Sequence, residues 1–335
     1  MTNQLKVAVV YGGKSEEHDV SRASAAGVLQ HLDRKRFNPM PVYVTTTGIW
    51  EIDEIGGRPG DGRDSMVGGL SRAITALRGC DVVFPVMHGR FGEDGVLQAF
   101  LEMVGVPYVG SGVLASAVCM DKAVTKRVLT SAGIAVADGV VVTAENPGVS
   151  GSDRDRLGLP AFVKPARSGS SIGVSRLDDW SQLDEALVLA RKTDDKVLVE
   201  AAVRGREIDI AVLEHPDGRV VAGPPLEIGV PPGHAFFDYD AKYADRATMF
   251  RVPADLAPAA AETLQECAVR VFHELGCRGQ ARVDFFLRDD GTPVVNEINT
   301  APGLTAMSQV PRVWAAAGLD YGSLLTVLID TALTR

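Results

Sequence analysis

The sequence lacks the features of a zinc-binding, disulfide-rich or membrane protein. Its four cysteines, Cys80, Cys119, Cys267 and Cys277, form no CxxC pair and have no histidines at ligand spacing, so we expect reduced thiols in the core. The apolar run near the N-terminus has four residues, and no stretch approaches the ~20 apolar residues of a membrane span. We therefore expect a soluble, cytoplasmic protein with no membrane partner.

Positive charge is also scarce. The 34 Lys and Arg residues are outnumbered by 43 Asp and Glu residues, and the resulting net charge of −9 argues against a nucleic-acid partner. With 46% hydrophobic residues over 335 positions, the chain is long enough for two or three domains. The order of segments predicts three α/β units, at residues 1–115, 116–200 and 201–335.

Aromatic residues are few, and their distribution is uneven. Of the 20 in the chain (11 Phe, 6 Tyr and 3 Trp), four lie within FFDYDAKY, residues 236–243. These four, Phe236, Phe237, Tyr239 and Tyr243, are interleaved with charged residues. The pattern is compatible with a buried strand or with a lid that closes over a ligand.

The first third of the chain has the pattern of an open parallel α/β sheet. The segment LKVAVVY, residues 5–11, is typical of a buried strand, and apolar residues at helical spacing follow at 20–32. Further short strands are expected at 40–44 and 81–87. Ligands of such sheets usually bind at the carboxyl ends of the strands.

The rest of the chain alternates helix and strand patterns. We expect helices at 115–133, 178–192, 257–275 and 319–333, a hydrophilic loop at 144–158, and strands at 139–142, 160–164, 196–200, 281–287 and 293–299.

The strongest chemical signal lies in ARVDFFLRDDGTPVVNEINT. Its Asp-Gly pair favours a two-residue hairpin turn, which would place Asp284 opposite Glu297 and Arg282 opposite Asn299, all on one face. Two facing carboxylates repel each other unless a cation lies between them, and Asp, Glu and Asn oxygens suit Mg²⁺. The alternative is a solvated outer face on which Arg282 neutralises the acids.

Two further stretches suggest nucleotide binding. In FVKPARSGSSIGVS, Lys164 ends a strand and small residues follow, including Ser170 and Ser171, as in a flexible flap over phosphates; a plain surface turn is the alternative. In VLVEAAVRGRE, Glu200 and Glu207 flank an apolar connector that could present free backbone groups to a base edge, unless both acids are only solvated.

Several other polar residues are weaker candidates. Glu17 lies in GGKSEEHDVS at a helix start, where the helix dipole alone favours an acid. His88 begins a glycine-rich turn after a strand, which suits either a ligand contact or a structural hydrogen bond. Lys122 and Lys126 lie on a helix, where a solvated face is the ordinary explanation.

Taken together, these stretches resemble the D-alanine–D-alanine ligases, a family of ATP-grasp enzymes. The resemblance covers essentially the whole chain, in family order, through GGKSEEHDVS, HGRFGEDG, PYVGSGVLASAVCMDK, FVKPARSGSSIGVS, VLVEAAVRGRE, FFDYDAKY, RVDFFL and NEINTAPGLTAMS. It implies a three-domain ATP-grasp fold, with ATP between the central and C-terminal domains, and a homodimer.

The resemblance also implies a role for each site residue. The ligands of two Mg²⁺ ions, with Mn²⁺ as a substitute, are Asp284, Glu297 and Asn299. The contacts to ATP are Lys122, Lys164, Ser171, Glu200, Ala201, Val203, Glu207 and Lys242. The first D-alanine and the oxyanion are held by Glu17, His88, Ser170, Tyr243, Arg282 and the N–H of Gly303, and the second substrate by Ser308 and Gln309.

The implied reaction joins two D-alanines for peptidoglycan precursors through an acyl phosphate and needs no protein nucleophile. Positioning and clustered positive charge would carry the catalysis. Because water hydrolyses an acyl phosphate, we expect 236–243 to close as a lid.

Three alternatives remain open. A D-alanine–D-lactate ligase shares this machinery; Tyr243 favours the dipeptide product, whereas Phe237, where the family more often has tyrosine, and Gln309, where an apolar residue is common, depart from the pattern. A nicotinamide-dependent oxidoreductase is disfavoured because the GxGxxG fingerprint is absent. A catalytically inactive nucleotide-binding protein would not need the acids, amide and arginine of the hairpin.

Overall fold

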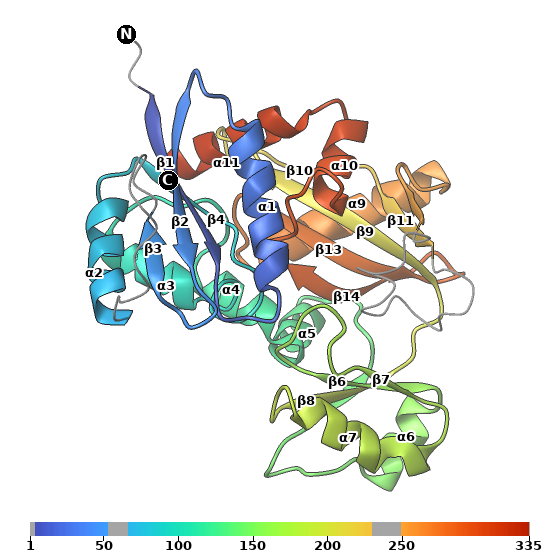
Figure 1. Ribbon diagram of the computed structural model, residues 1–335. Coiled ribbons are helices and arrows are strands. Elements are labelled where there is room, and N and C mark those ends of the chain that lie inside the picture. The colour runs from blue at the N-terminus through green and yellow to red at the C-terminus, as the bar shows by residue number, and fades with distance from the viewer. Residues whose placement is uncertain (1–3, 53–65, 230–248, 335) are drawn as a thin grey trace.

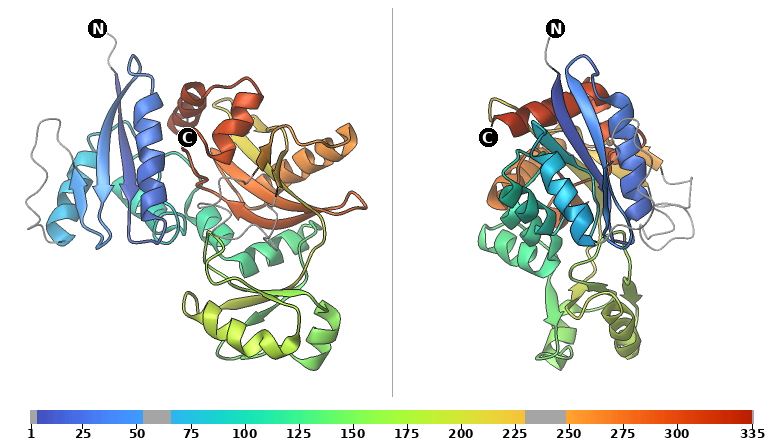
Figure 2. Two further views of the ribbon diagram at one scale, coloured as in Figure 1. Left: turned by 45° about the vertical axis from the view of Figure 1, so that its right-hand side comes forward. Right: turned by 60° about the vertical axis from the view of Figure 1, so that its left-hand side comes forward.

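Three units make up the computed structural model, which describes residues 4–52, 66–229 and 249–334. The N-terminal and C-terminal units lie side by side, and the middle unit projects away from them (Figure 1, Figure 2). The predicted lid at 236–243, which includes Lys242 and Tyr243, lies outside the described residues.

The N-terminal unit is built on a four-stranded sheet in the order β3-β2-β1-β4. Its strands are β1 (Leu5–Gly12), β2 (Phe37–Val44), β3 (Trp50–Ile52) and β4 (Val82–Pro85), and its helices are α1 (His18–His31), α2 (Met66–Leu77) and α3 (Val96–Val104). As predicted, β1 is parallel to β2 and β4. The edge strand β3 was not predicted and is antiparallel to β2, because a short turn at 45–49 reverses the chain.

The predicted helix at 115–133 is in fact two helices. α4 (Val113–Met120) and α5 (Lys122–Ser131) are separated by Asp121, which has an extended backbone. The Asp121 side chain accepts from the Val124 N–H at 3.1 Å and so caps α5. The Asp121 carboxylate also binds Lys196 Nζ at 2.7 and 2.9 Å, which fixes the break.

The middle unit has a separate antiparallel sheet in the order β5-β8-β6-β7. Its strands are β5 (Gly139–Val142), β6 (Ala161–Pro165), β7 (Ser175–Leu177) and β8 (Val197–Ala201), and its helices are α6 (Gly151–Leu157), η1 (Trp180–Gln182) and α7 (Leu183–Arg191). The expected loop at 144–158 therefore contains a helix. Its sequence shows no apolar periodicity because Leu157 is the one residue of α6 that is buried.

The C-terminal unit has a six-stranded antiparallel sheet in the order β12-β11-β9-β13-β14, with β10 paired to β9. Its strands are β9 (Arg206–Glu214), β10 (Val220–Ala222), β11 (Leu226–Gly229), β12 (Met249–Arg251), β13 (Gln280–Leu287) and β14 (Pro293–Asn299). Its helices are α9 (Pro258–Glu274), α10 (Gln309–Ala316) and α11 (Tyr321–Leu333).

The hydrophobic cores show how the units are joined. One core packs β1 and α1 of the N-terminal unit against α10 and α11, with Phe84 and Trp314 among its members. A second packs α4, α5 and α9 on the C-terminal sheet. Residues 116–131 therefore pack on the C-terminal sheet, although the sequence analysis groups them with the predicted second unit, residues 116–200. The middle unit has its own core around Leu177 and Val199.

Across 4–52, 66–229 and 249–334, no single helix is long and apolar enough to cross a membrane. Only α10 and α11 reach the required length and hydropathy together, and they are bent by 103° at the break between them. Residues of both helices, such as Val313 and Leu328, are buried in the core shared with the N-terminal unit.

Candidate active site

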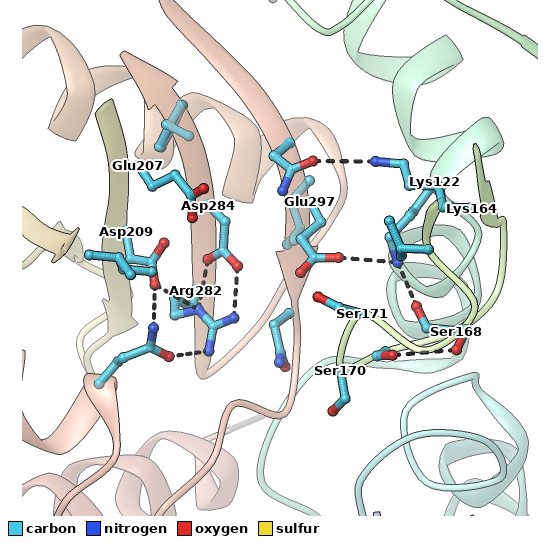
Figure 3. Close-up of a pocket in the computed structure, with 18 of the residues that line it drawn as sticks. Lys122, Lys164, Ser168, Ser170, Ser171, Glu207, Asp209, Arg282, Asp284 and Glu297 are labelled. Carbon is cyan, nitrogen blue, oxygen red and sulfur yellow. Dashed lines mark hydrogen bonds and ion pairs between the residues drawn. The ribbon is translucent and has the colours of Figure 1, made fainter. Parts of the chain in front are cut away.

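A cleft of about 1390 Å³ lies where the three units meet, and Figure 3 shows part of it. Within the described ranges, every predicted site residue lines this cleft. They are Glu17, His88, Lys122, Lys164, Ser170, Ser171, Glu200, Ala201, Val203, Glu207, Arg282, Asp284, Glu297, Asn299, Gly303, Ser308 and Gln309. The fold therefore brings these residues together, while the role of each remains a prediction.

The hairpin of β13 and β14 has the predicted pairs. Asp284 lies opposite Glu297, and Arg282 lies opposite Asn299. All four side chains line the cleft, so the alternative of a solvated outer face does not hold. Arg282 nevertheless neutralises one acid, because its Nε and Nη2 donate to the two carboxylate oxygens of Asp284, both at 2.7 Å.

The turn of this hairpin differs from the prediction. Three residues rather than two separate Arg288 from Thr292, whose backbone atoms are bonded at 3.1 Å. A β-bulge at Asn296 then shifts the register back by one residue. Asn296 lines the cleft next to Glu297, and its Oδ1 accepts from Lys164 Nζ at 3.4 Å. Sequence reasoning missed Asn296. The one indication of it in the sequence is that two consecutive polar residues, Asn296 and Glu297, interrupt the alternation of apolar and polar residues along the strand.

Asp209 on β9 is a second residue that sequence reasoning missed. It is 2% exposed, and its Oδ2 accepts from Gln309 Nε2 at 2.7 Å and lies 3.4 Å from Arg282 Nε. Gln309 Oε1 accepts from Arg282 Nη1 at 2.7 Å, so the guanidinium is held on two sides. Burial and the Asp284 carboxylate raise the pKa of Asp209 well above its usual range. The sequence holds one signal for Asp209: it lies two residues after Glu207 on the same strand, so both side chains point to one face of the sheet.

Lys122 faces the hairpin from the start of α5. Its Nζ lies 3.1 Å from Glu297 Oε2 and donates to the Ser168 carbonyl at 2.7 Å. One ammonium group therefore joins α5, β14 and the loop between β6 and β7, residues 166–174, which we call the serine-rich loop. Lysines arranged around carboxylates in this way are suited to binding phosphates together with a divalent cation.

The serine-rich loop between β6 and β7 has a strained backbone. Ser170 and Ser171 have φ values of 53° and 57°, in the left-handed region. Ser170 Oγ donates to Glu17 Oε1 at 2.5 Å, which links this loop to the start of α1. A Cβ at Gly89 would lie only 2.7 Å from Glu17 Oε2, so the glycine leaves space for the carboxylate. Glu17 makes no capping hydrogen bond to α1, and its carboxylate accepts from Ser170 instead.

His88 is both hydrogen-bonded and part of the cleft lining. It is 5% exposed; Nε2 lies 3.0 Å from Ser24 Oγ, and Nδ1 lies 2.9 Å from the Ala301 carbonyl and 3.3 Å from Glu93 Oε1. Burial acts to lower the pKa of His88, but Glu93 and Glu17 outweigh it and raise the pKa overall. A structural role and a substrate contact are therefore compatible.

Glu200 on β8 is paired with two lysines. It is 3% exposed; its Oε2 lies 2.6 Å from Lys164 Nζ and its Oε1 lies 2.7 Å from Lys126 Nζ. Lys126 is itself only 7% exposed, so the expectation of a solvated helix face is wrong for this residue. The side of α5 that carries Lys126 turns toward β8 instead of solvent.

The connector after Glu200 offers fewer free donors than predicted. The N–H groups of Ala201 and Ala202 donate to the carbonyls of Asp138 at 2.9 Å and Pro160 at 3.1 Å. They are occupied because the pairing of β8 with its neighbours continues past the end of the strand. If a backbone N–H of this connector donates to a base, it is therefore that of Val203.

Gly303 and Ser308 lie next to each other before α10. Ser308 Oγ accepts from the Thr305 N–H at 3.1 Å and lies 2.8 Å from Thr305 Oγ1. A Cβ on Gly303 would lie 3.1 Å from Ser308 Oγ. The predicted oxyanion donor and the predicted carboxylate-binding hydroxyl are thus neighbours.

The hairpin supplies oxygen donors for a divalent cation. Within the part of the chain that the structure describes, no three His, Cys, Asp or Glu side chains converge as a metal site. Asp284 and Glu297 face each other on the hairpin, so two carboxylates and the Asn299 amide line the cleft there. Such a set fits Mg²⁺, which typically keeps waters and takes phosphate oxygens for its remaining positions.

Comparison with known proteins identifies similar sequences along nearly the whole chain. Residues 6–111 match the family model for the D-ala D-ala ligase N-terminus, and residues 128–330 match the model for its C-terminus. A D-alanine–D-alanine ligase from Nocardia farcinica is 48% identical, over 100% of this chain and 99% of the relative. One from Mycolicibacterium vanbaalenii is also 48% identical, with the same two coverages.

Solved structures show the same fold. The VanG D-Ala:D-Ser ligase from Enterococcus faecalis matches with a TM-score of 0.83 and 32% identity, covering 98% of this chain and 100% of its own. The D-alanine–D-alanine ligase from Coxiella burnetii has a TM-score of 0.82 and 31% identity, covering 98% and 94%. That from Bacillus anthracis, complexed with ATP, has a TM-score of 0.79 and 27% identity, covering 98% and 97%.

Proposed function

The chain belongs to the D-alanine–D-alanine ligase family, and from this premise we propose that it uses ATP to join two D-alanines for peptidoglycan precursors. The observation that carries the proposal is the pairing of Asp284 with Glu297 and of Arg282 with Asn299 on the cleft face of one hairpin. Facing carboxylates beside an arginine, with lysines across the cleft, are the groups that phosphoryl transfer requires.

ATP would bind between the middle unit and the C-terminal sheet. Its base would lie along Glu200, Ala201 and Val203, its ribose at Glu207, and its phosphates at Lys122, Lys164, Ser171 and Lys242. The divalent cation, Mg²⁺ or Mn²⁺, would be held by Asp284, Glu297 and Asn299 and would neutralise phosphate charge. The protein's own cations then supply the remaining positive field.

The first D-alanine would bind at the start of α1. Glu17 would accept from its ammonium group, with Ser170 and Tyr243 fixing the carboxylate of Glu17 and His88 nearby. The substrate carboxylate then attacks the γ-phosphorus of ATP, which gives an acyl phosphate and ADP. The contribution of these residues is to hold that carboxylate in line with the phosphate.

The second D-alanine would bind beside α10. Ser308 would hold its carboxylate and Gln309 would border its pocket, so that its amine attacks the acyl phosphate and inorganic phosphate leaves. Negative charge develops on the carbonyl oxygen in this step. Arg282 and the N–H of Gly303 are the donors assigned to that oxygen.

The test is release of phosphate that depends on both ATP and D-alanine. Asp284→Asn and Glu297→Gln should each lower this rate by roughly two or more orders of magnitude, because each removes an anionic ligand. Near-normal turnover in both variants would refute the metal assignment. Phosphate release without D-alanine would instead refute the ligase assignment.

The choice of acceptor needs a separate argument, because Phe237 and Gln309 depart from the family pattern. We propose D-alanine, on the strength of Tyr243 and of relatives named D-alanine–D-alanine ligase. Supplying D-alanine together with D-lactate or D-serine across a range of pH should give mainly D-alanyl-D-alanine at neutral pH. Predominant depsipeptide at neutral pH would assign a D-lactate acceptor instead.

We also propose a cytoplasmic homodimer that binds small molecules and no nucleic acid. The net charge of −9 supports the absence of a nucleic-acid partner. Light scattering on the purified protein should give twice the mass of the chain, and a monomer mass at all concentrations would contradict the dimer.

A further inference from the structure

Glu200 has one more cation beside it than its charge requires. Lys164 and Lys126 approach its two carboxylate oxygens at 2.6 and 2.7 Å. The approach of Lys126 is an ion pair between two groups that lie away from solvent. Both Glu200 and Lys126 are buried, at 3% and 7% exposure.

The two lysines differ in their access to the cleft. Glu200 and Lys164 are among the described residues that line it, whereas Lys126 is not. Lys164 also reaches Asn296 on the hairpin, at 3.4 Å, so it already bridges the middle unit and the predicted phosphate site. Lys126 contacts Glu200 from α5, behind the cleft wall, and would stay there when a ligand binds.

This arrangement matters because a buried charge without a partner is strongly unfavourable. If Lys164 alone neutralised Glu200, its movement to a phosphate would leave the carboxylate unpaired. Burial acts to raise the pKa of Glu200, but Lys126 and Lys164 outweigh it and lower the pKa overall. With Lys126 in place, the carboxylate remains ionised after Lys164 moves.

We infer that Lys126 is a positioning residue: it is the permanent counterion of Glu200, which frees Lys164 for the nucleotide phosphates and keeps Glu200 a hydrogen-bond acceptor toward the amino group of adenine. The inference rests on the proposed function in taking ATP as the nucleotide. An ionised carboxylate only accepts hydrogen bonds. It therefore favours the 6-amino group of adenine over the 6-oxo group of hypoxanthine.

Calorimetric binding of ADP and IDP, each with Mg²⁺, tests the inference without turnover. Lys126→Met keeps an unbranched side chain, shorter by one atom, and removes its charge. We expect ADP to bind at least about tenfold more weakly. Without Lys126, Lys164 is the one cation left beside the buried Glu200 carboxylate, so it stays there and does not move to the phosphates. The loss should be smaller for IDP. Lys192→Met, the same change at an exposed position of the middle unit, should bind both as wild type does.

A second substitution separates the counterion role from packing. Glu200→Gln removes the charge that needs a counterion and gives a side chain that both donates and accepts. Lys126→Met/Glu200→Gln should therefore bind ADP more tightly than Lys126→Met alone and should discriminate less between ADP and IDP than wild type. A packing defect at Lys126 would not be rescued in this way.

The outcomes are distinct. Wild-type affinity in Lys126→Met, or a double variant as weak as Lys126→Met, would overturn the inference and leave the proposed function standing. Failure of the wild type to bind ADP would overturn both. If Lys126→Met does not fold, the double variant is compared with Glu200→Gln; affinities within about threefold support the counterion role, and a tenfold gap overturns it.

Discussion

Gln309 contributes to the site through Arg282. Its Oε1 accepts from Arg282 Nη1 and its Nε2 donates to Asp209 Oδ2, both at 2.7 Å. Both ends of the amide are therefore engaged by protein groups. This geometry favours a role in orienting the guanidinium over direct hydrogen bonding to the second substrate.

Replacing Gln309 by leucine tests that role. Gln309→Leu leaves Arg282 and Asp209 without their bridge, and a hydrogen bond to a charged group is worth about 1.5–3 kcal/mol. We expect kcat to fall roughly tenfold to a hundredfold with little change in KM for ATP. Steady-state kinetics of phosphate release measures both, with Gln30→Leu on the exposed side of α1 as the control. An unchanged kcat would mean that the Asp284 and Asp209 carboxylates orient Arg282 without Gln309.

At this scale, the sequence predicts residues that pair by simple rules and misses those that depend on tertiary packing. Asp284 and Glu297 follow from hairpin pairing. Lys126 looks solvated because nothing in a helix pattern tells which structure covers its polar side, and α5 turns that side toward β8. Asp209 requires knowledge that β9 lies beside β13, a pairing between segments about 75 residues apart.

At the scale of elements, the hairpin prediction is correct at the site and wrong at the turn. An Asp-Gly pair is compatible with a two-residue turn and also with a three-residue loop whose last residue is a left-handed glycine. Gly291 has a φ of 82°, which both turns accept. The bulge at Asn296 cancels the extra turn residue, so the two deviations offset each other at Asp284 and Glu297.

The break between α4 and α5 depends on Asp121, which makes a cap and an ion pair with one side chain. Asp121→Ala should lower the free energy of unfolding by about 1–2 kcal/mol, since it removes both. Asp121→Asn keeps an oxygen for the cap, and we expect it to recover most of that loss. Urea unfolding of the two variants makes the comparison. Equal losses would show that the ion pair to Lys196 dominates and the cap does not.

Asp194 anchors the start of the serine-rich loop. Its carboxylate accepts from the Arg167 N–H at 2.8 Å, from Arg167 Nε at 3.1 Å and from Nη2 at 2.5 Å. Burial acts to raise the pKa of Asp194, but these bonds outweigh it and lower the pKa overall. A depressed pKa means that the ionised form stabilises the fold above the unfolded-state value near 3.8, and that this contribution is lost as the pH falls below it.

Asp194→Asn should therefore have a pH-dependent effect on stability. At pH 7 we expect the free energy of unfolding to fall by about 1–2 kcal/mol, and the difference from wild type to shrink as the pH falls below the unfolded-state value near 3.8. Asp195→Asn is the control, because Asp195 also binds Arg167 but is 92% exposed and should change stability little. A difference that stays constant with pH would show that the hydrogen bonds do not depend on the charge.

At the scale of the whole molecule, the sequence predicts the three units and the order of most elements, but not how the units pack. Local patterns specify helices and strands. The sharing of one core by β1, α1, α10 and α11 depends on contacts between opposite ends of the chain. That core joins the outer units into one body, while the middle unit packs around a core of its own.

This division predicts where nucleotide binding stabilises the protein. ADP with Mg²⁺ would contact β8 and Lys164 of the middle unit and β9, β13 and β14 of the C-terminal sheet, so it should hold those two bodies together. Hydrogen exchange of amides in β6, β8 and β14 should slow. The free energy of opening that it reports should rise by up to about 2.7 kcal/mol when the ADP concentration is a hundred times Kd. Amides of β1 and β2, whose core lies away from the nucleotide, should change little. Equal protection across all three sheets would contradict this, because it would mean that the middle unit opens only when the whole molecule unfolds.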